Sequence, residues 1–292
     1  MPPPPEDPNE FKISSEVELV LLDVSVKDAN GGFASGLKKE QFKVYEDGKE
    51  QEIRIFASQD IPVTVGLVID NSASMRSRRP EVVTAALTFV QQSNPQDEVF
   101  VVNFNDKVSL GLPPGTPFSD DRQQLRQALL GNPVQGRTAL NDAVKLALQQ
   151  LEKGRRDKKT LVVVSDGGDN ASAISAADVL RLAEESTATI YTIGIFDEDD
   201  KDKNPGFLKR LASVTGGEAF LPQNLGELVP TCEKIAKDIR NRYTIGFAPG
   251  VTGNATRKLR VLASAPDRGK LIVRTRTHYI AGGRNAGRKP RR

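Results

Sequence analysis

Three oxygen-bearing side chains stand at every second position just after an apolar stretch of the chain. Asp70, Ser72 and Ser74 follow residues 63–69, which are all apolar or small. An apolar run without alternation is typical of a strand buried on both faces, as in a parallel sheet covered by helices. Open α/β sheets bind their ligands at the carboxyl ends of such strands. The spacing therefore predicts a cluster of hard oxygen ligands where this strand ends.

Two more oxygen ligands occur where a doubly wound sheet would bring them near the first three. Thr138 lies in the loop before a predicted helix, and Asp166 ends the apolar segment LVVVSD. Loops at the carboxyl ends of parallel strands converge where the strand order reverses, so we expect the five side chains to meet there. Three hydroxyls and two carboxylates, without His or Cys, suit Mg²⁺, Mn²⁺ or Ca²⁺ and do not suit zinc. The candidate metal ligands are Asp70, Ser72, Ser74, Thr138 and Asp166.

The same side chains have a simpler interpretation as helix caps and turn acceptors. Asp and Ser are favoured at helix starts and in turns because their oxygens accept backbone N–H groups. A D-x-S-x-S string alone is also weak evidence, since both residue types are common. The position of the string at a strand end, and the two matching residues elsewhere, favour metal binding over capping.

The placement of these residues depends on a regular alternation of strand and helix between residues 61 and 241. Apolar strands and amphipathic helices follow one another, which specifies a doubly wound, mainly parallel α/β sheet. Thr138 or Asn141 is expected to cap the helix that begins near Leu140. The predicted strands are 63–70, 98–106, 159–166 and 189–195, with an edge strand near 108–112, and the predicted helices are 79–93, 121–130, 140–151, 175–186, 207–214 and 225–240.

Period-two patterns flank this region on both sides. Three strands are predicted before residue 61, around residues 22–26, 42–44 and 53–55, and three after residue 241, in RYTIGF, KLRVLAS and KLIVRTRTHY. We expect the two sets to pack as one small β-sandwich into which the α/β domain is inserted. Two separate β appendages are the alternative, and each would be marginal in size. The expected organisation is a disordered segment 1–14, sandwich strands in 15–60, the α/β domain 61–241, sandwich strands in 242–281 and a basic flexible tail 282–292.

Composition indicates a globular chain and argues against two kinds of partner. The 292 residues are 38% hydrophobic, which is sufficient for a core. The formal net charge is +3, and the last eleven residues are strongly basic, so the folded part is nearly neutral and no nucleic-acid surface is expected. No apolar run reaches the roughly 18 residues that a membrane span needs. The single Cys232 excludes an intrachain disulfide.

The string DNSAS at 70–74, together with Thr138 and Asp166, resembles the complete metal-ion-dependent adhesion site of von Willebrand factor A (VWA) domains. The resemblance covers about residues 61–241 and implies a Rossmann-like fold. It also implies that the two serines bind the metal directly, and that the threonine and the two aspartates bind it directly or through water. The remaining metal position would then be open to an Asp or Glu carboxylate of a protein ligand.

The segment before this region resembles a hairpin of bacterial VWA-related proteins, which are often exported. The pattern F-x-V-x-E-D-G-x-x-Q runs here from Phe42 to Gln51. The resemblance implies a location outside the cytoplasm, whereas the start MPPPPEDPNE lacks the basic and apolar regions of a signal peptide. We therefore expect a secreted or periplasmic protein whose signal peptide is absent from this chain, and a cytoplasmic location stays open.

The site chemistry and the resemblance predict a non-enzymatic module that uses a divalent metal for protein binding or adhesion. No G-x-G-x-x-G follows the first strand and no G-x-x-x-x-G-K-[ST] occurs, so dinucleotide and P-loop chemistry lack their phosphate cradle. The only histidine, His278, lies far along the chain from Ser72, which argues against a Ser-His-Asp arrangement. A metal-dependent phosphoester hydrolase and a structural scaffold with an unused metal site remain the alternatives. The acidic loop 197–202 lacks EF-hand spacing and is predicted to be a solvated loop.

Overall fold

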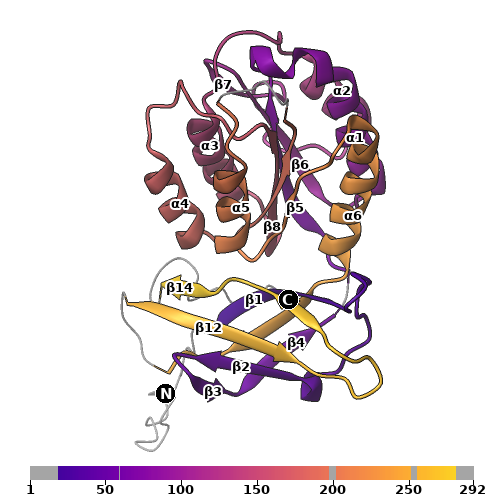
Figure 1. Ribbon diagram of the computed structural model, residues 1–292, viewed down its shortest axis with the longest axis vertical. Helices are drawn as coiled ribbons and strands as arrows, with labels where there is room; N and C mark the ends of the chain where they lie inside the picture. Colours follow the sequence, from indigo (N-terminus) through magenta and orange to yellow (C-terminus); the bar gives the residue numbers. More distant parts are fainter. Residues whose placement is uncertain (1–18, 59, 197–201, 251–254, 281–292) are drawn as a thin grey trace, which may run out of the picture.

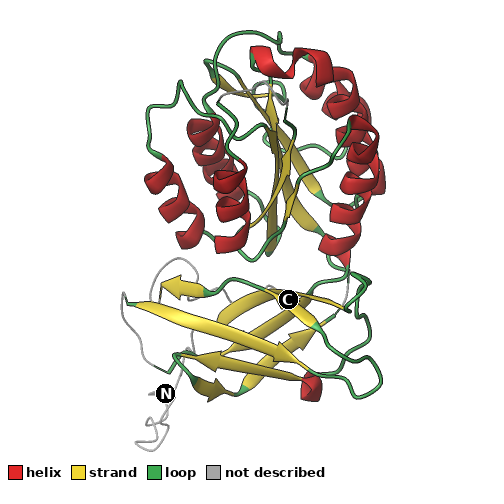
Figure 2. Ribbon diagram, in the orientation of Figure 1, coloured by secondary structure: helices red, strands yellow, loops and turns green. Residues whose placement is uncertain are grey.

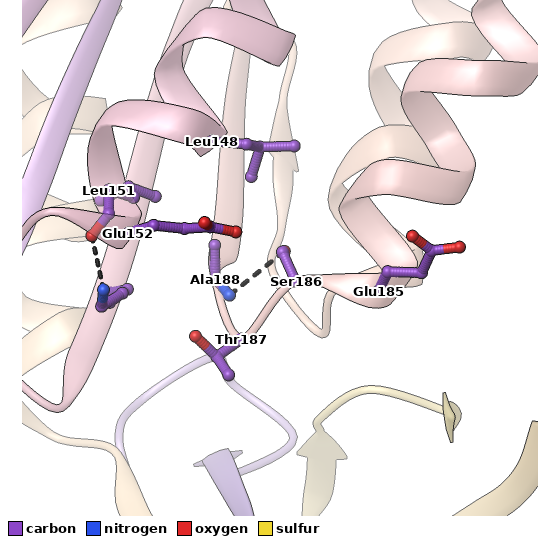
Figure 3. A pocket seen from close by; sticks show the side chains of 8 residues that line it. Leu148, Leu151, Glu152, Glu185, Ser186, Thr187 and Ala188 are labelled. Atoms are coloured by element: carbon purple, nitrogen blue, oxygen red, sulfur yellow. Dashed lines mark hydrogen bonds between the residues drawn. The ribbon is translucent and has the colours of Figure 1, made fainter. Parts of the chain in front are cut away.

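The computed structural model describes residues 19–58, 60–196, 202–250 and 255–280. These residues form an α/β domain that sits on a smaller β-sandwich (Figures 1 and 2). The disorder expected for residues 1–14, the flexible tail expected at 282–292 and most of the acidic loop 197–202 lie outside the described residues. Among the described helices, none has the length and apolar character that a membrane span requires.

The α/β domain is built on a six-stranded sheet with the order β10-β9-β8-β5-β6-β7. β5 (Val63–Asp70) lies at the centre, and all eight of its residues are buried because parallel strands flank it and helices cover both faces. Only the edge pairing of β7 with β6 is antiparallel. The sheet confirms the predicted doubly wound, mainly parallel α/β fold. Its other strands are β6 (Glu98–Phe104), β7 (Val108–Leu110), β8 (Lys158–Ser165), β9 (Thr189–Gly194) and β10 (Ala219–Phe220).

Helices cover both faces of this sheet. α1, α2 and α6 lie on one side of it, and α3, α4 and α5 lie on the other (Figure 1). Their apolar residues and those of the strands form one continuous core. The helices are α1 (Arg79–Gln92), α2 (Arg122–Leu130), α3 (Leu140–Glu152), α4 (Ala176–Glu185), α5 (Pro205–Val214) and α6 (Leu228–Arg240), with short 3-10 helices η2 (Ala73–Arg78) and η3 (Leu225–Glu227).

The start of α3 differs from the sequence prediction. Neither Thr138 nor Asn141 caps this helix through its side chain, because the N-cap position is Ala139, which carries no oxygen. The backbone N–H of Asn141 instead donates to Asp169 Oδ2 at 2.7 Å, and the next N–H donates to Ser172 Oγ at 3.0 Å. Both acceptors come from the loop after β8. A cap from so distant a segment leaves no signal in the local sequence.

The β-sandwich contains two four-stranded sheets with the orders β13-β1-β11-β4 and β14-β12-β2-β3. Each sheet combines strands that precede the α/β domain with strands that follow it. Aromatic rings fill the space between the sheets, as in the contact of Phe42 with Tyr243 at a centroid distance of 5.0 Å. The strands are β1 (Val20–Lys27), β2 (Phe42–Glu46), β3 (Lys49–Gln51), β4 (Ile53–Ala57), β11 (Tyr243–Phe247), β12 (Thr256–Ala263), β13 (Ile272–Arg274) and β14 (His278–Ile280), and a 3-10 turn η1 (Lys39–Gln41) precedes β2.

Two details of the sandwich differ from the predicted three strands on each side. The segment KLIVRTRTHY is not one strand, because β13 pairs with β1 in one sheet and β14 pairs with β12 in the other. The chain changes sheets between these strands while its period-two pattern continues, so the pattern alone could not locate the break. The Asp47-Gly48 turn is followed by a separate short strand, β3, before β4 begins.

Buried charged groups connect the sandwich to the α/β domain. Arg242, just after α6, donates from Nη2 to the carbonyl of Asp23 at 2.9 Å in the sandwich and to the carbonyl of Gly216 at 3.0 Å in the α/β domain. Its Nη1 donates to the Tyr191 hydroxyl at 2.9 Å, and that hydroxyl donates to Asp238 Oδ2 at 2.5 Å. These side chains are almost fully buried. The junction is therefore a buried hydrogen-bond network and not a solvated linker.

The charge of Asp238 depends on its cationic neighbours. Burial alone would raise the pKa of this carboxyl, but attraction to Arg242 and Lys27 and hydrogen bonds from Ser25 and Tyr191 hold its pKa below the ordinary value. The carboxylate is therefore one of two anions that balance the buried guanidinium; Asp23 Oδ2 is the other, 3.1 Å from Arg242 Nε.

Gly66, in the middle of β5, provides a test of how tightly the central strand is packed. A Cβ at this position would lie 2.4 Å from Phe100 Cζ and 2.6 Å from Leu161 Cδ2. We expect Gly66→Ala to lower the free energy of unfolding by about 1–3 kcal/mol because the neighbours must shift. Urea denaturation measures the change. Gly206→Ala, whose Cβ would meet its nearest atom at 3.5 Å in the first turn of α5, should be close to neutral, and equal losses in the two variants would contradict the packing argument.

The junction network makes a second stability prediction. Asp238→Asn removes one of the two anions that pair with Arg242 and leaves the buried guanidinium short of compensation, so we expect a loss of about 3–5 kcal/mol in unfolding free energy. Glu185→Gln breaks an exposed pair with Arg181 at 3.1 Å and should cost about 0.5 kcal/mol or less. Thermal or chemical denaturation compares the two. A loss at Asp238 no larger than that at Glu185 would show that the network does not stabilise the junction.

Candidate metal centre

Two acidic residues meet at the carboxyl ends of neighbouring strands. Asp70 is the last residue of β5, and Asp166 follows the last residue of β8, which pairs with β5 in parallel register. β5 starts beside the sandwich and ends at the opposite edge of the α/β domain (Figure 1). The two carboxylates therefore lie on the face of the domain that points away from the sandwich.

The two predicted serines lie between these carboxylates. Ser72 Oγ is 3.0 Å from Ser74 Oγ, and Ser74 Oγ donates to Asp166 Oδ2 at 2.7 Å. Asp70 is held in the same loop because its Oδ1 accepts the Ser72 backbone N–H at 2.8 Å. Four of the five predicted residues thus form one hydrogen-bonded cluster, and Ser74 is exposed to solvent at its edge.

Thr138 lies in a loop that contacts this cluster through its backbone. The carbonyl of Gly136, two residues before it, accepts the N–H of Ala73 at 3.1 Å. The Thr138 N–H donates to Asn170 Oδ1 at 2.9 Å, and its carbonyl accepts the N–H of Asn170 at 3.0 Å. The Thr138 hydroxyl forms no hydrogen bond to the other four residues in the described part of the chain. The structure brings its loop beside the cluster without placing the hydroxyl in it.

Sequence reasoning missed Ser165 and Asn170. Ser165 Oγ donates to Asp70 Oδ2 at 2.7 Å and accepts the N–H of Gly167 at 3.0 Å, so it fixes both acidic loops at once. A hydroxyl at the last position of an otherwise apolar strand was the available signal. Asn170 has no comparable signal, because its role depends on a loop far away in the sequence. Gly167 completes the turn with a φ of +80°, where a Cβ would lie 2.5 Å from the Asn204 carbonyl oxygen.

The electrostatics of the cluster favour a cation. Burial raises the pKa of Asp70 to about 7, and repulsion by Asp166 adds to the effect, against hydrogen bonds from Ser165 and Ser72. Arg79 attracts Asp70, but the Arg79 guanidinium donates to the carbonyl of Leu129 and burial lowers the pKa of Arg79. Two neighbouring carboxylates that resist joint ionisation are stabilised when a divalent ion binds between them.

The donor set fits a hard divalent ion. The clustered groups are carboxylate and hydroxyl oxygens, which Mg²⁺, Mn²⁺ and Ca²⁺ prefer. In the described residues, no group of three or more His, Cys, Asp and Glu side chains is arranged to hold a metal, so a metal site here would have to rely on serine hydroxyls beside two carboxylates. Few direct carboxylate ligands would leave a bound ion partly positive.

Comparisons with known proteins agree with this fold. A family model for the von Willebrand factor type A domain matches residues 64–234. The chain is 24% identical over 193 residues to an uncharacterised protein of Synechocystis sp., covering 62% of this chain and 42% of that protein. It spans less than two thirds of each curated relative that it matches.

Two solved structures have a similar fold, and one of them covers most of this chain. A von Willebrand factor type A structure from Catenulispora acidiphila superposes with a TM-score of 0.54 at 15% identity, covering 91% of this chain and 75% of that one. Proximal thread matrix protein 1 from the mussel byssus, with zinc in its metal-ion-dependent adhesion site (MIDAS) motif, superposes with a TM-score of 0.52 at 16% identity. The match covers 62% of this chain and 48% of that one. At these identities the likeness concerns the fold.

The raised pKa of Asp70 predicts a pH-dependent metal affinity. A metal bound at the cluster would compete with the proton on this carboxyl, so Mg²⁺ affinity should rise with pH through about 7 and fall about tenfold for each pH unit below it. Calorimetric titration from about pH 5.5 to about pH 8 measures the profile. Asp178→Asn removes an exposed carboxyl whose pKa is lowered, and it should leave the profile unchanged. A flat profile in the wild-type protein would contradict a proton shared with the metal site.

The raised pKa of Asp70 also makes the stability of the metal-free protein depend on pH. The folded state binds the Asp70 proton more tightly than the unfolded state, whose carboxyl has an ordinary pKa of about 4. The contribution of this group to stability is therefore greatest at low pH and falls as pH rises from about 4 to about 7. Urea denaturation in EDTA should show a smaller decline over this range for Asp70→Asn than for the wild-type protein.

Proposed function

Because the chain belongs to the von Willebrand factor type A domain family, we propose that it is a protein-binding module whose contact with its partner depends on a divalent metal. The metal would be held at the end of β5 by Ser72, Ser74 and Asp166, with Asp70 and Thr138 binding directly or through water. The bound ion would supply a partly neutralised positive charge at the protein surface. We propose no catalytic role for the site.

The observation that carries this proposal is the hydrogen-bonded cluster of two serines and two aspartates with one edge exposed. Ser74 Oγ, which donates to Asp166 at 2.7 Å, belongs to an exposed residue. An ion bound there would be accessible from solvent. Mg²⁺ usually keeps water in the coordination positions that the protein does not fill. An Asp or Glu carboxylate of the partner is the hard, anionic ligand suited to such a position.

We infer that the ion is Mg²⁺, with Mn²⁺ and Ca²⁺ as substitutes. An all-oxygen donor set favours these ions, whereas Zn²⁺ sites in proteins usually contain His or Cys. The mussel protein of similar fold has zinc in its MIDAS motif, so zinc belongs among the ions to be tested. A location outside the cytoplasm also remains part of this proposal, on the resemblance of the segment from Phe42 to Gln51 to exported proteins.

The decisive experiment removes the two serine hydroxyls that we propose as direct ligands. Ser72→Ala/Ser74→Ala should weaken Mg²⁺ binding more than tenfold in calorimetric titration, because two hydroxyl ligands are lost. Ser213→Ala is the matched control, since this exposed hydroxyl on α5 donates only to the Arg210 carbonyl among the described contacts. Wild-type protein that gives no Mg²⁺- or Mn²⁺-dependent heat would overturn the metal site.

The partner half of the proposal needs its own measurement. Immobilised wild-type protein should retain partner proteins in Mg²⁺ and release them in EDTA, and the double serine variant should retain none while Ser213→Ala behaves as wild type. Retention that ignores EDTA would indicate a scaffold with an unused site. Turnover of p-nitrophenyl phosphate that Asp70→Ala abolishes would favour the hydrolase alternative.

A further inference from the structure

A groove of about 560 Å³ lies on the outer face of the sandwich sheet β14-β12-β2-β3. It is remote from the candidate metal centre, which lies at the far edge of the α/β domain (Figure 1). The groove runs over β12 and is bordered by side chains from β2 and β14. The lining residues used below are Tyr45, Lys258, Arg260, Leu262 and His278.

The pleat of β12 sorts its side chains between the two faces. Leu259 and Val261 are buried in the sandwich core, whereas Lys258, Arg260 and Leu262 are exposed. Alternate residues of a strand point to the same face about 7 Å apart. The outer face of β12 therefore presents two cations and then an apolar side chain in a straight row.

Cross-strand neighbours complete the lining on both sides of this row. Tyr45 of β2 lies opposite Arg260, and His278 of β14 lies opposite Lys258. Both belong to the groove, so a ligand lying along β12 would meet a phenol on one side and an imidazole on the other. These groups supply hydrogen bonds and ring surface, and the Glu50 carboxylate that accepts from the Tyr45 hydroxyl at 3.4 Å is itself paired with Lys43.

Neither cation of the row forms an ion pair within the described residues, although the Asp47 carboxylate lies near enough to the Lys258 ammonium to attract it. Nearby charges are already paired, because Lys43 lies 3.4 Å from Glu50 and Arg257 lies 3.0 Å from Asp47. No ion pair or hydrogen bond involves the Lys258 ammonium or the Arg260 guanidinium in the described part of the chain. Leu262 is 38% exposed beside them and gives the row an apolar end.

We propose that this surface, here called the β12 groove, binds an extended acidic segment of a partner protein. The matching segment would place carboxylates at alternate positions, followed two residues later by an apolar side chain. An extended chain repeats its side chains with the same spacing as β12, so its two carboxylates would face Lys258 and Arg260 while the apolar residue covers Leu262.

The composition of the groove favours a peptide over other anions. A nucleic acid or a charged glycan is bound through a longer series of cations, whereas the β12 groove has two unpaired cations on a folded body that is nearly neutral. Neither polymer offers an apolar side chain for Leu262. The proposal concerns a site separate from the metal centre and does not rest on the function proposed for it.

A short fluorescent peptide with the order Glu-Thr-Glu-Thr-Leu, flanked by Gly and Ser, tests the β12 groove. Fluorescence anisotropy with the whole chain in EDTA and low salt measures binding, and EDTA prevents the peptide carboxylates from reaching a metal. We expect saturable binding that weakens as salt is raised. Lys258→Glu/Arg260→Glu should weaken it at least tenfold, and Leu262→Ser should weaken it severalfold.

Matched controls keep the result specific. Lys209→Glu/Arg210→Glu makes the same charge change on exposed residues of α5 and should bind the peptide as the wild type does. A charge reversal could disturb the sheet, so Lys258→Gln/Arg260→Gln repeats the test without introducing acidic residues. Thermal melts check that each variant is folded. The proposal is overturned if the peptide does not bind the wild-type chain, if both charge-reversal variants lose binding equally, or if Glu-Glu-Thr-Thr-Leu or heparin binds as tightly as the designed order.

Discussion

The repulsion between two carboxylates held at adjacent strand ends is the constraint on which the functional face of this protein depends. Asp70 and Asp166 are fixed by the parallel pairing of β5 with β8, and burial leaves little solvent to screen their charges. Hydroxyl groups partly offset the repulsion, because Ser165 donates to Asp70 and Ser74 donates to the second carboxylate, Asp166. Donated hydrogen bonds reduce the repulsion without neutralising it. A divalent ion would neutralise it, and this is the physical basis of the metal site that we propose.

The elements around the site serve to hold loops in place. Backbone hydrogen bonds join the loop after β5 to the loop before α3, and Asp169 and Ser172 from the loop after β8 receive the first N–H groups of that helix. Each loop is thus held by contacts with other loops as well as by hydrogen bonds of its own. At the opposite edge of the sheet, the buried network around Arg242 connects the α/β domain to the sandwich. The candidate metal centre and the β12 groove therefore lie on two parts that are joined by buried hydrogen bonds.

The strength of the sequence signal explains which features could be predicted. The long apolar strands and amphipathic helices predicted the doubly wound sheet, and the positions of Asp70, Ser72, Ser74 and Asp166 at strand ends placed them in one cluster. Features that depend on distant residues were missed. The caps of α3 come from another loop, Ser165 acts on an acidic residue from a different strand, and one period-two pattern concealed the change of sheet between β13 and β14. Thr138 was predicted as a ligand from its place in the loop before α3, and the structure brings that loop beside the cluster without a hydrogen bond from the Thr138 hydroxyl to it.

A crystal structure of the protein grown or soaked with Mn²⁺ would test the central claim most directly, because anomalous scattering locates the ion independently of any assumed ligand. We predict one strong peak at the end of β5, in contact with the hydroxyls of Ser72 and Ser74 and close to Asp166, with Thr138 drawn toward it directly or through water. A well-ordered cluster without an anomalous peak, in crystals that contain millimolar Mn²⁺ at a pH above 7, would show that these oxygens stabilise the loops and do not bind a metal.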